Sequence, residues 1–143
     1  MHSTDAAASD AAASSSSSDA SSSSSSSSDA YLSSVLDDFP PTCAAFAYGS
    51  AVFSQSGYSA DQRAQAMLDL VLVVDEPEAW HAANLVANAA HYSPVGRLLG
   101  ARRVAHVQED IGAAMYYNHA SVRGRLVKYG VISRRALVDD LSR

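Results

Sequence analysis

Two short stretches decide the fold that this sequence predicts: Ala47-Tyr48-Gly49-Ser50 and, after a gap of 18 residues, Asp69-Leu70-Val71-Leu72-Val73-Val74. The first is typical of a strand that leaves through a Gly-Ser turn, because glycine tolerates the backbone conformations of tight turns. The second is apolar after Asp69, as in a strand covered on both faces. A turn that can hold phosphates, beside a carboxylate that can hold a metal ion, is the arrangement of a nucleotidyltransferase-type site.

Further strands and helices are expected to alternate along the rest of the chain. Such alternation predicts an α/β (α+β) domain with a nucleotidyltransferase-like mixed sheet and flanking helices. The expected strands are Cys43–Tyr48, Met67–Val74 and Leu126–Ile132, the last interrupted by Gly130. The expected helices are Tyr31–Phe39, Asp75 to about Asn88, and Arg134–Leu141 with Ser133 as its N-cap.

The helix after Asp69–Val74 carries a predicted start signal. Asp75 fits the N-cap position, Glu78 follows three residues later as in a capping box, and Pro77 is tolerated in the first turn. Less regular segments are Ala51–Arg63, expected to be a loop, and Val95–Leu99, expected to be a short helical turn. Val104–Val107 fits either a strand or a turn.

The amino-terminal part of the chain differs in composition from the rest. Residues 1–30 are mostly Ser, Ala and Asp, with too little apolar surface to offset the entropy of ordering, so a disordered low-complexity tail is expected there. Residues 31–143 are left for a folded domain. Residues 1–62 carry seven acids and no Lys or Arg, whereas the remainder carries ten basic and eight acidic residues. This mildly basic part suits an anionic substrate or a membrane surface, and equally an ordinary solvated face.

Simple features exclude several classes of protein. The single cysteine, Cys43, rules out an internal disulfide and is expected to be a small buried side chain. No apolar run approaches the roughly 18 residues of a membrane span, and neither a secretory signal nor an Arg-rich mitochondrial presequence is visible. Phosphate-loop, dinucleotide-binding, zinc-protease and Cys/His metal motifs are also missing.

The carboxylate of Asp69 is the main candidate for chemistry. An acid at the edge of an aliphatic strand is costly unless it is exposed, paired or bound to a metal. Asp75 lies six residues farther on, about 20 Å along an extended strand, so the two cannot share one ion. Val71 stands where a second acid of an Asp-x-Asp pair would be expected. Candidates for a further acid are Asp61, Glu109, Asp110, Asp139 and Asp140.

Two other polar residues lie within apolar segments. Lys128, in Val127-Lys128-Tyr129-Gly130, would either clamp a triphosphate or point outward as an alternating strand residue. His81, next to Trp80, is more typical of a packing histidine than of a ligand.

Several motifs together resemble the mitochondrial translocator assembly and maintenance protein family, the peripheral, matrix-side CDP-diacylglycerol synthases. The resemblance runs in order from about Leu32 to Leu141. It rests on Ala45–Gly57 (AFAYGSAVFSQSG), Ser59–Arg63 (SADQR), Met67–Pro77 (MLDLVLVVDEP), Trp80-His81, Asn84-Leu85, His91-Tyr92-Ser93, Gly112–Asn118 (GAAMYYN) and Gly124–Ser133 (GRLVKYGVIS).

The resemblance implies a phosphatidate cytidylyltransferase that uses Mg²⁺ to join CTP and phosphatidic acid into CDP-diacylglycerol, releasing pyrophosphate. It implies a role in phosphatidylglycerol and cardiolipin synthesis at the matrix side of the mitochondrial inner membrane. A nucleic-acid partner is not expected. Catalytic roles would fall to Asp69, also the metal ligand, and to Lys128. Nucleotide binding would involve Tyr48, Gly49, Ser50, Asp61, Gln62 and Tyr129.

The chain also departs from that family. Ala51 and Ala114 stand where the family usually has glycine, and the family's members continue well beyond the point matching Leu141. Residues 31–143 are therefore expected to form the N-terminal part of a catalytic domain, with weak or no activity by itself. Two other hypotheses remain open: a non-catalytic assembly factor of the inner membrane, and a nucleotidyltransferase with a different acceptor.

Overall fold

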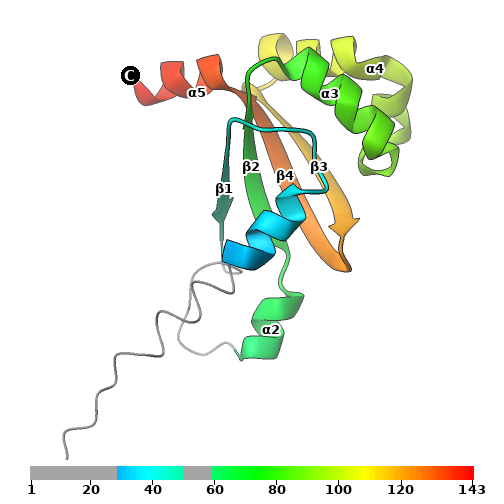
Figure 1. The fold of residues 1–143 in the computed structure, drawn as a ribbon. Coiled ribbons are helices and arrows are strands. Elements are labelled where there is room, and N and C mark those ends of the chain that lie inside the picture. Colours follow the sequence, from blue (N-terminus) through cyan, green and yellow to red (C-terminus); the bar gives the residue numbers. More distant parts are fainter. Residues whose placement is uncertain (1–28, 50–58) are drawn as a thin grey trace, which may run out of the picture.

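A four-stranded mixed sheet organises the part of the chain that the structure describes, residues 29–49 and 59–143 of a computed structural model. The strands are β1 (Ala44–Tyr48), β2 (Leu68–Val74), β3 (Met115–Val122) and β4 (Arg125–Ser133), in the order β1-β2-β4-β3. β2 and β4 are parallel, while β1 and β3 pair antiparallel at the edges (Figure 1). The predicted fold class is confirmed, and Gly130 lies within β4 without interrupting it.

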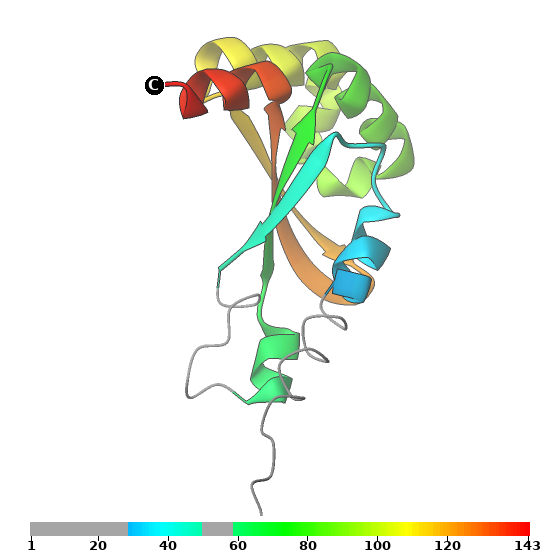
Figure 2. The same ribbon diagram turned by 60° about the vertical axis from the view of Figure 1, so that its left-hand side comes forward.

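Helices connect and cover the strands. They are a helix over residues 29–36, drawn in blue without a label, α2 (Ala60–Gln65), α3 (Pro77–Ala87), α4 (Pro94–His106) and α5 (Arg134–Leu141), with short turns η1 (Ala89–His91) and η2 (Val107–Ile111). Figure 2 shows the helices α3, α4 and α5 at one end of the sheet and α2 at the other. Among the described residues, no helix is both long and apolar enough to cross a bilayer.

The core lies on one face of the sheet. Alternate side chains of the strands, including Leu70, Val127 and Tyr129, pack there against Val35 and Trp80. Since side chains alternate along a strand, the residues between them point to the opposite face. The described residues cover that face only in part: α5 packs against β2 and β4 at one end, whereas none of the described helices packs on the other end.

Helix starts are partly as predicted. Ser133 caps α5, its side chain accepting a hydrogen bond from the backbone N–H of Ala136 at 3.2 Å. Asp75 is not the cap of α3. Glu76 occupies that position without a side-chain hydrogen bond, and Asp75 instead pairs with Arg134 at 2.6 Å. Pro77 has no N–H, so an Asp75 cap would lack one of the backbone donors that a helix N-cap normally accepts from.

Three other expectations are wrong. Residues 60–65 form α2, so part of the predicted loop is helical; its remainder, with Ser50 and Ala51, falls outside the described residues. Residues 94–106 form one helical segment in place of the expected short helical turn and the following strand or turn, with a bend at Gly100, where φ is 76°. Cys43 is exposed, because it precedes edge strand β1, and its sulfur accepts a hydrogen bond from Arg134 at 3.3 Å.

Candidate functional site

The open end of the sheet brings together residues from all four strands. Tyr48 of β1 is in register with Asp69 of β2, Asp69 with Lys128 of β4, and Lys128 with His119 of β3. Side chains in register lie on the same face, with Cβ atoms of neighbours about 5 Å apart. Four polar side chains therefore form one row across the face, near the end at which β1 finishes and β2 begins (Figure 1).

The turn after β1 touches the carboxylate of β2, as the two opening stretches predicted. Gly49 has a φ of 87°, a conformation that residues with a side chain rarely adopt. A Cβ on Gly49 would come within 3.0 Å of the Asp69 carboxylate oxygen Oδ2. The backbone of the turn and the carboxylate are therefore adjacent, and glycine is required by both the dihedral angle and the space.

Asp69 is available for a ligand. Its side chain is half-buried, and no hydrogen bond or ion pair within the described part of the chain engages its carboxylate. The Asp69 charge and the burial of Tyr48 together raise the pKa of the Tyr48 hydroxyl, burial having the larger effect. The prediction that β2 is covered on both faces is wrong at Asp69 and Val71, which are both half-exposed.

Lys128 also lies on this open face. It points away from the core, as the alternation along β4 requires, and this direction is also toward the site. Its Nζ atom lies 5.0 Å from the centre of the Tyr117 ring on β3, a cation–π contact. Gly130 leaves room for this ring, since a Cβ at Gly130 would come within 2.8 Å of Tyr117 Cε1 and 2.5 Å of Met115 Sδ. Sequence reasoning named Lys128 but missed Tyr117 and His119, whose link to Asp69 depends on strand register.

Tyr129 has a different place from its neighbour Lys128. Its side chain is fully buried on the helix-covered face. There its hydroxyl accepts hydrogen bonds from Nδ2 of Asn84 and Nδ2 of Asn118 at 3.0 and 3.1 Å, and contacts Nδ1 of His91 at 3.1 Å. Burial raises the pKa of Tyr129 to about 12. The hydroxyl therefore links α3, η1 and β3 through buried hydrogen bonds, on the opposite face of the sheet from Asp69.

A second hydrogen-bonded cluster extends from Asn84. Nδ2 of Asn84 donates to the Tyr92 hydroxyl at 3.0 Å, and Nδ1 of His81 lies 2.8 Å from the same oxygen. Nε2 of His81 lies 2.9 Å from Oε1 of Gln108. The His81 side chain is fully buried, which confirms the expectation of a packing histidine, and burial lowers its pKa.

Asp61 and Gln62, both predicted to bind nucleotide, lie in α2. Asp61 is exposed in the first turn. The Gln62 side chain accepts a hydrogen bond from the Ser59 backbone at 2.9 Å, while the Ser59 hydroxyl accepts one from the Gln62 backbone at 3.2 Å. This reciprocal pair is a capping box, so the Gln62 side chain stabilises the start of α2.

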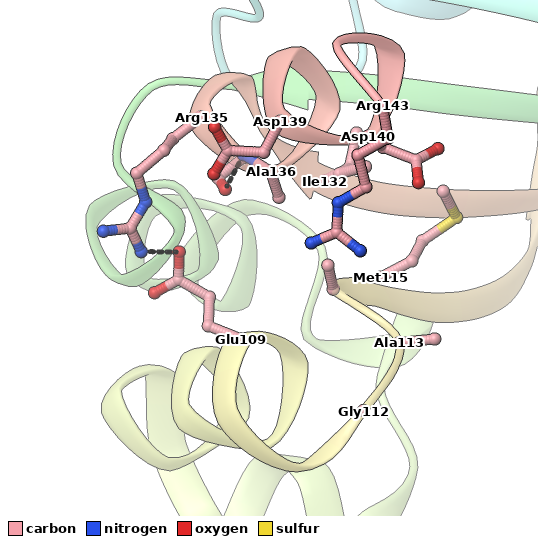
Figure 3. A pocket seen from close by; sticks show the side chains of 12 residues that line it. Glu109, Gly112, Ala113, Met115, Ile132, Arg135, Ala136, Asp139, Asp140 and Arg143 are labelled. Atoms are coloured by element: carbon pink, nitrogen blue, oxygen red, sulfur yellow. Dashed lines mark hydrogen bonds and ion pairs between the residues drawn. The ribbon is translucent and has the colours of Figure 1, made fainter.

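Four of the five acids considered as partners of Asp69 lie elsewhere, and the fifth, Asp61, lies in α2. A hollow of about 560 Å³ at the other end of the sheet is lined by Glu109, Asp139 and Asp140 together with Arg135 and Arg143 (Figure 3). Ile132 of β4 also lines it, four residues or about 13 Å along the strand from Lys128. Asp110 pairs with His106 at 2.6 Å. Within the described residues, no group of three or more His, Cys, Asp or Glu could hold a metal ion.

The residues present nevertheless fit a Mg²⁺ ion shared with a substrate. Magnesium is commonly held through one or two carboxylates, with phosphate oxygens and waters completing its shell. Asp69 offers one carboxylate, which no residue in the described part of the chain pairs, beside a glycine turn of the kind that can bind phosphate. Lys128 adds a cation on the neighbouring strand.

A mixed sheet with flanking helices, a glycine turn and an adjacent strand carboxylate define the class of nucleotidyltransferase-like proteins. Comparison with known proteins gives the particular family. Residues 32–143 match the family model described as "Phosphatidate cytidylyltransferase, mitochondrial", and the chain belongs to that family.

Curated relatives with that same name support the assignment. The rat protein is 50% identical over 112 residues, covering 77% of this chain and 33% of the relative. The human protein is 47% identical over 109 residues, covering 75% of this chain and 24% of the relative. The fission yeast protein is 41% identical over 112 residues, covering 77% and 28%. The chain thus spans about a quarter to a third of the length of these relatives.

Proposed function

We propose that this chain supplies the nucleotide-binding part of a mitochondrial phosphatidate cytidylyltransferase, which makes CDP-diacylglycerol from CTP and phosphatidic acid. The observation that carries the proposal is the contact between the Gly49 turn and the carboxylate of Asp69, which no described residue pairs, beside Lys128. Family membership supports it, as do relatives named for that activity and for mitochondria.

In the proposed reaction, an oxygen of the phosphatidate phosphate attacks the α-phosphorus of CTP. The new P–O bond forms as the bond from the α-phosphorus to the bridging oxygen of the β-phosphate breaks, and pyrophosphate leaves with that oxygen. Asp69 would hold Mg²⁺, which supplies neutralisation of the triphosphate charge when bound. Lys128 would stabilise negative charge on the phosphates as the bond breaks.

The turn and the strands each have a part in this proposal. The Gly49 turn lies directly beside the Asp69 carboxylate, and because glycine has no Cβ, a phosphate would be able to approach the backbone of the turn closely. Mounting Asp69 and Lys128 on neighbouring parallel strands fixes their separation, since strands are rigid compared with loops. We extend the proposal to a peripheral contact with the matrix side of the inner membrane, where the lipid acceptor and the route to cardiolipin would lie.

A chimaera tests the activity most directly, because the chain matches only part of each relative. Residues 32–143 would replace the matching segment of the rat protein, and CDP-diacylglycerol would be measured from labelled CTP, Mg²⁺ and phosphatidate vesicles. We expect Asp69→Asn to lower the rate at least about 100-fold, as for loss of a group that stabilises transition-state charge.

Asp75→Asn is the matched control, because Asp75 follows the other end of the same strand and pairs with exposed Arg134. It should retain nearly full activity. If the Asp69 variant instead makes CDP-diacylglycerol at the wild-type rate, the catalytic assignment is wrong, and a non-catalytic assembly role becomes the better hypothesis. RNA offered in place of phosphatidate should give no product.

A further inference from the structure

His119 belongs to the polar row of the open face, although neither its spacing nor a motif connects it with Asp69. It is exposed on β3 and is in register with Lys128, the next residue along the row. The two side chains therefore project from adjacent strands on the same face, about 5 Å apart at their Cβ atoms. Lys128 separates His119 from Asp69. The row therefore has Tyr48 and Asp69 on one side, and the nitrogen-bearing side chains of Lys128 and His119 on the other.

The contact with Tyr117 draws Lys128 toward β3. Tyr117 precedes His119 by two residues on the same strand, and its ring lies 5.0 Å from Nζ of Lys128. Among the described residues, no ion pair joins Lys128 to Asp69. The ammonium group is thus positioned by an aromatic ring on the His119 side, and is not neutralised by the carboxylate on its other side.

We propose that His119 and Lys128 form a phosphate-binding subsite on the β3 side of the row, which adjoins the phosphate site at Gly49 and Asp69 and shares Lys128 with it. An imidazole carries an N–H donor even when neutral, and an ammonium carries three, so one phosphate group can accept from both. In the described structure, no acid is in register with His119 or Lys128 on the β3 side to compete for these donors.

This subsite rests on the proposed function for the identity of its ligand. Cytidylyl transfer involves two kinds of phosphate besides the one attacked: the pyrophosphate part of CTP and the phosphate monoester of the lipid. A subsite about one strand spacing beyond Asp69 could take either, because both present terminal oxygens with at least one negative charge. The shared chemistry is a phosphate group, and the experiment separates the two sources.

Lys128 provides a direct readout, since it is the only lysine of the chain. A chain labelled with [ε-¹³C]lysine gives one side-chain NMR signal, which would be titrated separately with pyrophosphate, with CTP and Mg²⁺, and with soluble dihexanoyl phosphatidate. We expect at least one probe to shift the signal. We expect His119→Ala to weaken that probe's binding about fivefold to tenfold, the effect of a charge-assisted hydrogen bond at an exposed site.

Two variants make the result specific. His119→Gln retains an N–H donor and should lose no more than about twofold. His106→Ala removes another exposed histidine. His106 ends α4 and pairs with Asp110 of η2, so its removal should not change phosphate binding. Weakening confined to phosphatidate would identify the lipid phosphate as the ligand; weakening confined to pyrophosphate and CTP would identify the nucleotide tail.

Equal binding of all probes by wild type and His119→Ala would overturn the subsite, as would a Lys128 signal that responds to none of them. These failures are distinct from failure of the proposed function. If Asp69→Asn abolishes activity of the chimaera while His119→Ala binds normally, only the subsite is wrong. If the chimaera makes no CDP-diacylglycerol while His119→Ala weakens phosphate binding, the subsite stands without that function.

Discussion

At the residue scale, single backbone positions decide whether the site can form. Gly49 combines a φ of 87° with a close approach to Asp69, so its hydrogen side chain is part of the site's geometry. Ala114 poses the opposite case. It has a φ of 61°, in the left-handed region where a residue with a Cβ is strained.

Gly49→Ala is expected to damage the site more than the fold. The added methyl group would press on Oδ2 of Asp69 from 3.0 Å, and the turn would have to leave its left-handed conformation. We expect loss of about 1–2 kcal/mol of stability and at least about tenfold weaker binding of CTP with Mg²⁺. Thermal unfolding and calorimetric titration measure the two effects. A variant that binds CTP normally would contradict the assigned role of the turn.

Ala114→Gly is expected to stabilise the protein. Glycine removes the strain of the left-handed conformation, although it also loses more backbone entropy on folding. The net gain should be about 0.5–1 kcal/mol, measured by urea unfolding. Ala113→Gly is the matched control, because Ala113 does not have a positive φ and should lose stability. A destabilised Ala114→Gly variant would show that strain at this position is negligible.

At the element scale, the β3–β4 pair determines where Lys128 points. Arg123 and Gly124 form its two-residue turn, both with positive φ, and Arg123 also makes two contacts with the Asp38 carboxylate at 2.7 and 3.2 Å. The pair then places Tyr117 over Gly130 and beside Lys128. Because Tyr117 contacts both Gly130 and Lys128, a substitution at Gly130 should change the position of the Lys128 side chain in the site.

Gly130→Ala is expected to overpack this pair. Its methyl group would lie 2.5 Å from Met115 Sδ and 2.8 Å from Tyr117 Cε1. Methionine can move, but displacement of the tyrosine removes the ring from Lys128. We expect a cost of about 1–3 kcal/mol in the free energy of unfolding. The Lys128 NMR signal should also lose the upfield displacement that a nearby ring causes; an unchanged signal would show that Tyr117 does not position Lys128.

At the scale of the whole molecule, two faces of one sheet have separate tasks. The helix-covered face contains the apolar core and the hydrogen-bonded cluster of Tyr129, Asn84 and His81. The open face bears the candidate site. Several motifs that carry the family resemblance, including Trp80-His81 and His91-Tyr92, belong to the buried cluster, so they stabilise the fold that supports the site.

The buried cluster should make stability depend on pH. Burial lowers the pKa values of His81 and His91 below the 6.5 of an exposed histidine. The unfolded chain then binds more protons than the folded one, so stability is fully present above about pH 6.5 and is lost as pH falls through the lowered values. The melting temperature should therefore be lower at pH 5 than at pH 7.5. A higher melting temperature at pH 5 would contradict the neutral state of these histidines.

Tyr129→Phe tests the cluster from its other end. Removing the hydroxyl takes away the acceptor for Nδ2 of Asn118 and one of the two acceptors for Nδ2 of Asn84, which keeps its bond to Tyr92; this should cost about 1–3 kcal/mol. Phosphate binding at Lys128 should be retained, because the two side chains lie on opposite faces of the sheet. The measurements are urea unfolding and titration with pyrophosphate; selective loss of binding would place Tyr129 in the site after all.

The sequence by itself determined β1, β2 and β4, the Gly49 turn and the cap at Ser133, whereas strand β3 was not expected. These features depend on local conformational preference and on the periodicity of apolar residues. The roles of Asp75 and Cys43 were predicted incorrectly, because an ion pair with distant Arg134 and a position at the sheet edge are tertiary facts.

Only the tertiary structure decided which polar residues share a face. His119 lies 50 positions after Asp69 in the chain, yet strand order and register place both in one row. Tyr129 follows Lys128 directly, yet alternation along β4 buries one and exposes the other. Chain separation says nothing about register, since a slip of one residue would exchange the two faces. The packing of apolar side chains against the covering helices fixes that register, and with it the composition of the site.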